Sequence, residues 1–178
     1  MGRHHDDMPN LAELGASAPT IAAFLGERIT KTGLCVLGTT RSDGWPRVSP
    51  IELSIVDDRI FVGSMPNAVK AQDLQRDPRC CIITTLADKD DLAGEAKAFC
   101  RAREILESEE WEPVRAVFLE KVGFDIGEPG GSHVFELDIE AAAWQRVEGD
   151  DWRTTSWRTG GGVRERVRNG PEGESHDL

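Results

Sequence analysis

Three short extended segments with tight turns between them decide the fold of this chain. They occupy residues 34–64, LCVLGTTRSDGWPRVSPIELSIVDDRIFVGS. Asp43-Gly44 and Asp57-Asp58 separate runs rich in valine, isoleucine, leucine and threonine, which is the pattern of strands joined by hairpin turns. Antiparallel neighbours can be joined this closely, whereas a parallel pair needs a crossover of about a dozen residues. The stretch therefore predicts an antiparallel meander of three strands.

Prolines interrupt the middle strand of this meander. Pro46 and Pro50 have no N–H group to donate to a sheet ladder. We therefore expect this strand to be bulged or to lie partly on a sheet edge.

The rest of the chain adds more strands and a few helices. Apolar side chains spaced three and four residues apart predict helices, and alternation of apolar with polar residues predicts strands. The predicted helices cover residues 20–30, 65–77 and 108–122, and the further strands cover 79–86, 95–105 and 133–147, with an extension at 151–158. The predicted fold class is mainly β. An antiparallel sheet of about six strands, with short flanking helices, curls or closes so that few edges stay exposed.

The chain is organised as one domain between two polar ends. Residues 1–17 form an N-terminal segment that we expect to be flexible. Residues 159–178 form a C-terminal tail, also expected to be flexible, that begins with a run of glycines at 160–162. Residues 18–158 carry the periodic apolar patterns, and one domain is the usual expectation for a chain of 178 residues.

Composition narrows the possible function classes. A formal net charge of −11 leaves no excess of lysine and arginine for a nucleic-acid backbone or an anionic membrane surface, so neither is an expected partner. No apolar run approaches the ~20 residues that span a bilayer, and the polar residues 1–10 lack the apolar stretch of a signal peptide. Cys35, Cys80, Cys81 and Cys100 form no C-x-x-C pair. We therefore expect buried thiols in a reducing cytoplasm and no bound metal.

The richest functional signal lies where the third strand passes into the short middle helix. That helix begins near Lys70, and a helix N-terminus exposes unpaired N–H groups and the positive end of the helix dipole. Ser64 adds a hydroxyl group and Arg47, on the preceding strand, adds a second cation, so together they form a candidate phosphate site. The same spacing also fits a solvated helix lysine and a serine that only caps the helix.

Ten residues stand in a recognisable order along these segments: Thr40, Asp43, Gly44, Pro46 and Pro50, followed by Lys70, Asp73, Leu74, Asp77 and Pro78. Together with the strand EAKAFCRARE at 95–104, they resemble the pattern of the pyridoxamine 5′-phosphate oxidase-like family, also called the FMN-binding split barrels. The resemblance covers about residues 18–158, with Cys100 where a glycine is common. It implies an antiparallel six-stranded split β-barrel of Greek-key-like order. It also implies a homodimer with two cofactor sites at the subunit interface.

The resemblance further implies which residues bind the flavin. Strand residues lie along the isoalloxazine ring and the ribityl chain, a helix lysine contacts the phosphate, and the second subunit adds side chains from near its C-terminal strand. The implied residues are Arg47, Val48, Ser49 and Pro50 at the ring, Gly63 and Ser64 beneath the ribityl chain and phosphate, Lys70 at the phosphate, and Trp157 and Arg158 from the second subunit.

Two departures from the family pattern bear on cofactor and substrate. Ala68 stands where the family often has a second basic residue, so phosphate binding depends more on Lys70, Arg47 and backbone N–H groups. The stretch RTTSWRTGGGVRERVRNG at 153–170 lacks the substrate-phosphate signature of true pyridoxamine phosphate oxidases. We therefore expect a substrate other than a vitamin B6 phosphate.

The predicted function is that of an FMN-dependent oxidoreductase that transfers a hydride between the flavin and an unknown small-molecule substrate. No catalytic side chain is assigned, because the sequence places no general acid or base. Two alternatives stay open. The first is a deazaflavin-dependent reductase on the same fold, with Arg47, Arg76 and Arg79 in a wider basic groove. The second is a non-catalytic protein that binds a flavin or heme.

Overall fold

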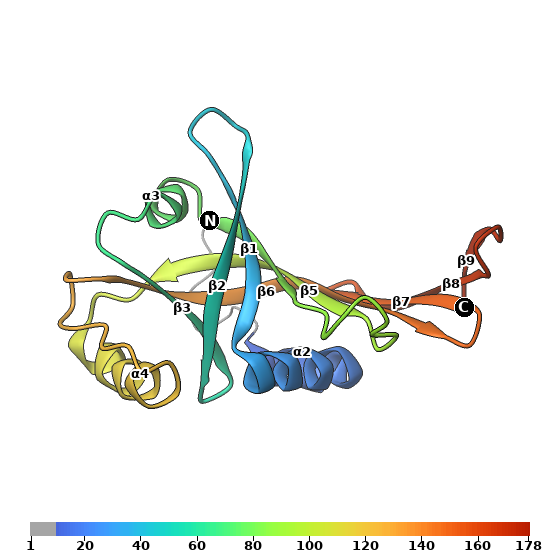
Figure 1. Cartoon of the computed structure of the whole chain (residues 1–178), viewed down its shortest axis with the longest axis horizontal. Helices are drawn as coiled ribbons and strands as arrows, with labels where there is room; N and C mark the ends of the chain where they lie inside the picture. Colours follow the sequence, from blue (N-terminus) through green and yellow to red (C-terminus); the bar gives the residue numbers. More distant parts are fainter. Residues whose placement is uncertain (1–9) are drawn as a thin grey trace.

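Six antiparallel strands close into a barrel, and three further strands extend its sheet into a wing (Figure 1). The computed structural model describes residues 10–178. The barrel strands are β1 (Leu34–Thr40), β2 (Pro46–Val56), β3 (Arg59–Ser64), β4 (Arg79–Thr84), β5 (Glu95–Glu104) and β6 (His133–Glu148). Their order is β3-β2-β1-β4-β5-β6, and pairing of β3 with β6 closes the barrel. The predicted fold class, mainly β with an antiparallel six-stranded barrel and short helices, is confirmed.

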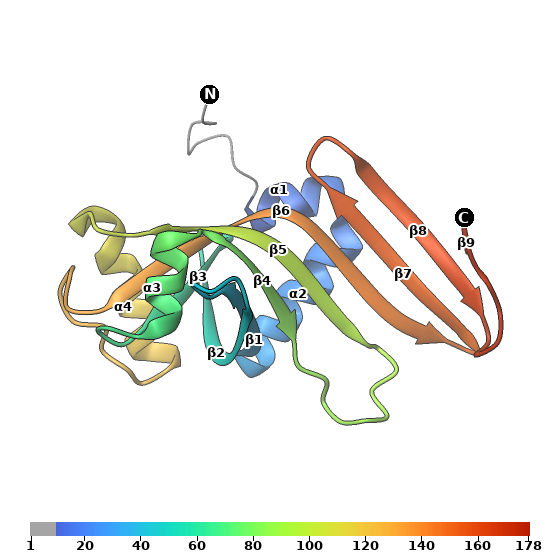
Figure 2. The same ribbon diagram turned by 90° about the horizontal axis from the view of Figure 1, so that it is seen from above.

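The wing continues from the second half of β6. Its strands are β7 (Asp151–Arg158), β8 (Gly162–Asn169) and β9 (Ser175–Asp177), each antiparallel to its neighbour. Figure 2 shows β6 running from the barrel out into this wing, with the C-terminus at its outer edge. The long strand β6 therefore belongs to both parts of the sheet.

Four helices accompany the sheet: α1 (Leu11–Ser17), α2 (Pro19–Thr32), α3 (Val69–Arg76) and α4 (Ser108–Lys121). Helix α2 starts with Pro19 in its first turn and ends at Gly33, whose φ of +64° is the left-handed conformation common after a helix. Helix α3 follows β3, and α4 lies between β5 and β6. Within residues 10–178, no helix is both long and apolar enough to cross a membrane.

Both ends of the chain contain elements that the sequence analysis left unassigned. Asn10 and Glu13 cap α1 reciprocally, since each side chain accepts a hydrogen bond from the other's backbone N–H. Val167 is the single buried apolar residue of strands β8 and β9. Without an alternation of apolar and polar residues, the sequence did not reveal these two strands. The flexibility expected of residues 11–17 and 159–178 stays a prediction, and residues 1–9 lie outside the described part.

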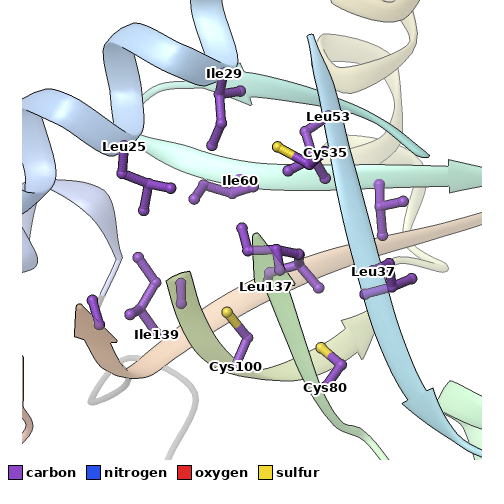
Figure 3. Packing of buried hydrophobic residues seen from close by; sticks show 14 of the residues in the cluster. Leu25, Ile29, Cys35, Leu37, Leu53, Ile60, Cys80, Cys100, Leu137 and Ile139 are labelled. Carbon is purple, nitrogen blue, oxygen red and sulfur yellow. The ribbon is translucent and has the colours of Figure 1, made fainter. Parts of the chain in front are cut away.

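The barrel interior holds the main hydrophobic core. Helix α2 directs Leu25 and Ile29 toward Ile60, Leu137 and Ile139 of the barrel strands, as Figure 3 shows. A second buried cluster lies under α4 and consists of Phe61, Ile105, Trp111, Val114, Phe118, Ile126 and Val134. This second cluster fixes α4 against the barrel.

Ion pairs join α4 to the barrel beside that cluster. The Arg59 guanidinium contacts Glu136 at 2.6 Å and Glu110 at 3.1 Å. Arg103 contacts Glu110 at 2.7 Å and Glu136 at 2.6 Å. Because Glu110 belongs to α4 and the other three residues to barrel strands, this network holds the helix in register with the sheet.

The proline-containing half of β2 lies on a sheet edge, as predicted. Strand β2 pairs with β1 from Pro46 onward, whereas its described pairs with β3 run only from Leu53 to Val56. The β1–β2 hairpin projects beyond the barrel (Figure 1), and the side chain of Trp45 beside its turn is 70% exposed.

Candidate functional site

A pocket of about 640 Å³ lies between the edge of the barrel and two helices. We call it the Lys70 pocket. It is lined by Leu34, Pro50, Ile51, Glu52, Gly63, Ser64, Met65, Lys70, Phe118, Val122, Gly123 and Phe124. The volume falls within the ~300–1,000 Å³ range of small-molecule sites. Four of the residues expected at the cofactor, namely Pro50, Gly63, Ser64 and Lys70, therefore line one pocket.

The turn between β3 and α3 places Lys70 at this pocket. Asn67 adopts a φ of +61°, a left-handed conformation that asparagine tolerates, and the Ala68 N–H donates to the Met65 carbonyl at 3.1 Å. The Ala68 carbonyl is the first helical acceptor and takes the N–H groups of Ala71 and Gln72. The N–H groups at positions 69 and 70 thus have no helical acceptor and are available to an anion.

Lys70 is the uncommitted cation of the pocket. Within the described part of the chain, its ammonium group makes no hydrogen bond or ion pair. Ser64, which is buried at the end of β3, lines the same pocket. A free ammonium, a hydroxyl and two N–H groups are a donor set that fits a phosphate ester.

Arg47 is engaged elsewhere and does not line the pocket. Its Nε donates to Asp73 Oδ2 at 2.6 Å, and Asp73 also accepts from Thr39 at 3.0 Å and Arg76 at 3.1 Å. Asp73 is only 3% exposed. Burial acts to raise the pKa of Asp73, but the hydrogen bonds from Arg47, Arg76 and Thr39 outweigh it and hold the pKa below its ordinary value. The group therefore anchors α3 to β1 and β2.

The other expected site residues lie outside the Lys70 pocket. Val48 is exposed and Ser49 half-buried, both on the projecting half of β2. Trp157 and Arg158 line a different hollow of about 1300 Å³, which we call the outer groove and which runs across β5, β6, β7 and the start of β8. Within one chain, Lys70 and Arg158 thus belong to two separate cavities.

Small side chains and arginines are among the residues that line the outer groove. Ala141, Ala143 and Ser156 line it, and so does Phe99, which is 50% exposed. Arg101 pairs with Glu140 at 3.2 Å. Among residues 10–178, Arg158 and Arg164 form no hydrogen bond or ion pair through their side chains. The groove therefore offers unpaired positive charge beside apolar surface.

The sequence analysis missed the wall that α4 gives to the Lys70 pocket. Phe118 is buried against Gly63, so closely that a Cβ at Gly63 would lie 2.9 Å from Phe118 Cε1. Val122 and Phe124 follow at the end of the helix and line the same pocket. The spacing of apolar residues in 108–122 predicted the helix, but it carried no signal for which helix end borders a cavity.

His133 forms part of a polar clasp at the start of β6, directly opposite Ser64 in the β3–β6 pairing. Its Nδ1 lies 2.7 Å from Glu104 Oε1, and Gln75 of α3 donates to Glu104 Oε2 at 2.9 Å. The clasp joins α3 to β5 and β6 on the side opposite the Asp73 anchor. His133 therefore has a partner that accounts for its position.

The cysteines are free and mostly buried. Burial raises the pKa of Cys35 to about 12, and Cys80 and Cys100 face each other across β4 and β5. Thiols in such surroundings are poor nucleophiles. Among residues 10–178, no group of three or more histidine, cysteine or acidic side chains is arranged to hold a metal ion.

Comparison with known proteins decides the family. The sequence profile described as pyridoxamine 5′-phosphate oxidase matches residues 21–145. The chain belongs to this family. The matched segment runs from α2 to near the end of β6, so the pyridoxamine 5′-phosphate oxidase profile covers the barrel strands, the Lys70 pocket and α4. The family resemblance inferred from the sequence is thereby confirmed.

Solved structures share the fold at low sequence identity. The heme binding protein of Mycobacterium smegmatis is 22% identical with a TM-score of 0.61, over 76% of this chain and 57% of that one. ChuZ of Campylobacter jejuni is 13% identical with a TM-score of 0.67, over 90% and 66%. The heme storage protein of Vibrio cholerae is 24% identical with a TM-score of 0.56, over 69% and 89%. This member of the pyridoxamine 5′-phosphate oxidase family thus spans less than two thirds of the first two proteins. Among curated proteins, no sequence matches it.

Proposed function

We propose that the protein binds FMN in the Lys70 pocket and serves as an oxidoreductase that passes a hydride between the flavin and a small molecule. The observation that carries this proposal is the unpaired ammonium group of Lys70 beside Ser64 and two free N–H groups. These groups bind the phosphate, and Gly63, which lines the same pocket, lies beneath the chain that leads from it. Bound FMN supplies the hydride chemistry, while the protein supplies binding and orientation.

We further propose that two copies of the chain complete each site. The backbone of β2 at Arg47, Val48, Ser49 and Pro50 is assigned to the ring of the flavin, while the Arg47 side chain stays bound to Asp73. Trp157 and Arg158 are assigned to reach the ring from the second copy. The unpaired Arg158 and the exposed Phe99 of the outer groove support a surface that another copy covers. With four free cysteines, the protein is assigned to the cytoplasm, where thiols stay reduced.

FMN is preferred to a deazaflavin because the arginines that a wider groove needs are already bound. Arg47 and Arg76 contact Asp73, and Arg79 contacts Asp77 at 2.6 Å. Each would have to leave a carboxylate in order to bind a longer acidic tail. This arrangement makes the deazaflavin-dependent reductase the weaker candidate.

Heme is the second candidate ligand. Two of the structural relatives are a heme binding protein and a heme storage protein. A heme iron needs an axial ligand such as histidine, cysteine, methionine or tyrosine. Among the described residues that line the Lys70 pocket, Met65 is the one side chain of these types. A protein that binds heme there would therefore use Met65 or a residue from a second copy.

Spectroscopy of the purified protein tests the proposal. We expect copurified or added FMN to give the two flavin absorption bands, and calorimetric titration to give a saturable heat. Dithionite-reduced flavin on the protein should then be reoxidised by a small-molecule acceptor. A Soret band in place of the flavin bands would favour the heme candidate. Absence of both flavin binding and flavin reoxidation would overturn the proposed oxidoreductase.

A further inference from the structure

We infer that the wall formed by Phe118, Val122 and Phe124 binds an uncharged, planar, largely apolar substrate next to the cofactor. This inference rests on the proposed FMN site and adds the chemical class of its second ligand. It excludes substrates that carry a phosphate or carboxylate of their own.

Exposed apolar surface inside the pocket is the first observation. Phe124 is 45% exposed and Leu34 is 49% exposed, and both line the Lys70 pocket. Val122, which lies between Phe118 and Phe124 in the sequence, is half-buried and also lines the pocket. Clustered apolar side chains open to a cavity are the usual sign of a surface that a ligand covers.

The distribution of charge is the second and independent observation. Lys70 is the single cationic side chain among the described residues of the lining. In the proposed site, the phosphate of the cofactor already pairs with it. Arg47 of β2 and Arg76 of α3 are both held by Asp73 and do not line the pocket. Glu52 adds a carboxylate to the lining. A second anionic ligand would therefore meet a carboxylate and no second cation among the described lining residues, whereas an uncharged ring meets aromatic carbon.

Two probes with the same ring system test the inference directly. 2-Naphthol is uncharged at neutral pH, and naphthalene-2-sulfonate carries one negative charge. Equilibrium dialysis against FMN-saturated protein should show 2-naphthol bound about tenfold or more tightly than the sulfonate, because the sulfonate lacks a counter-charge in the pocket. Equal affinities, or tighter binding of the sulfonate, would overturn the inference.

Substitutions on one helix end localise the binding. Phe124→Ser should weaken 2-naphthol binding about fivefold or more, since it removes apolar contact area. Leu119→Ser is the matched control, because Leu119 is 53% exposed in the last turn of α4, close to Phe124 in the sequence, but does not line the pocket. Phe124→Arg should reverse the preference in favour of the sulfonate. An unchanged affinity in both Phe124 variants would show that the ring binds elsewhere.

The design separates this inference from the proposed function. If 2-naphthol displaces FMN, the α4 wall is part of the flavin-binding site itself. The inference of a separate substrate surface then fails, while the cofactor proposal stands. If FMN does not bind at all, the cofactor proposal fails. The preference between the two probes on the protein alone then decides whether the wall selects uncharged rings.

Discussion

The guanidinium of Arg47 on β2 binds the carboxylate of Asp73 on α3, with 2.6 Å between Nε and Oδ2. This contact makes an arginine expected at the cofactor into part of the anchor that positions Lys70. Because Arg76 and Thr39 bind the same carboxylate, α3 is fixed to two strands through one buried side chain. The position of Lys70 therefore depends on Asp73.

Replacing Asp73 should destabilise the fold. Asp73→Asn keeps the shape but leaves two guanidinium groups without their anion, and we expect the free energy of unfolding to fall by about 2–4 kcal/mol. Urea denaturation measures this loss. Asp43→Asn, which breaks the half-exposed Arg41–Asp43 pair, is the control and should cost less than about 0.5 kcal/mol. Similar losses in the two variants would contradict the anchoring role.

Lys70→Ala should weaken FMN binding by about 1.5–3 kcal/mol, the scale of a charge-assisted hydrogen bond. Calorimetric titration gives the dissociation constants. Lys31→Ala, at an exposed position in the last turn of α2, should leave them unchanged. An equal dissociation constant for the wild type and Lys70→Ala would remove Lys70 from the phosphate site.

Mixed dimers can show which subunit supplies Arg158. If each site combines Lys70 of one copy with Arg158 of the other, a dimer of one Lys70→Ala chain and one Arg158→Ala chain has one doubly altered site and one intact site. Differently tagged, co-expressed chains should therefore recover wild-type FMN affinity at about half of the sites. Recovery at no site would mean that both residues act within one chain. Wild-type FMN affinity in the Arg158→Ala homodimer would instead mean that Arg158 does not contact the cofactor.

The ion pairs of α4 should make the free energy of unfolding depend on pH in the acid range. Hydrogen bonds from Arg103 and then Arg59 lower the pKa of Glu110 from its ordinary value of 4.5 to about 2. Since the folded-state pKa is the lower one, this contribution is fully present above pH 4.5 and is lost as the pH falls from there through about 2. The decrease in the free energy of unfolding between about pH 6 and about pH 3 should be smaller for Glu110→Gln than for the wild type. Glu112→Gln, at an exposed position of the same helix, should keep the wild-type difference.

Gly63→Ala should lower stability by about 1–3 kcal/mol, because the new methyl group overlaps the buried Phe118 ring. Adding Phe118→Leu should recover part of that loss by vacating the space. Gly15→Ala is the opposite control. A Cβ there meets Ala22 at an ordinary 3.8 Å inside α1, so we expect a gain of about 0.5–1 kcal/mol. Thermal unfolding of the three variants gives both signs, and stabilisation by Gly63→Ala would contradict the packing described.

The meander, the barrel and the meeting of Ser64 with Lys70 in one pocket could be predicted because their signals are local. Turn residues delimit β1, β2 and β3, and Lys70 stands near the start of a short helix that follows a strand. The contact between Arg47 and Asp73 could not be predicted. It depends on the register that sets Arg47 opposite Thr39 and on the packing of α3 against that pair. The α4 wall was missed for the same reason. Helical spacing identifies a buried face, but the cavity at its end arises only when β3 and α4 meet.

The prolines of β2 have a consequence for how the projecting hairpin behaves in a crowded solution. The Leu53 N–H donates to the Gly33 carbonyl, and because ladder bonds alternate, the backbone polar groups of positions 46, 48 and 50 point away from β1. Two of these three outward positions are prolines and offer no donor. A strand of another molecule that approaches this edge would therefore find no N–H donor for most of its carbonyl groups. The hairpin can therefore extend far from the body without seeding β-sheet aggregates.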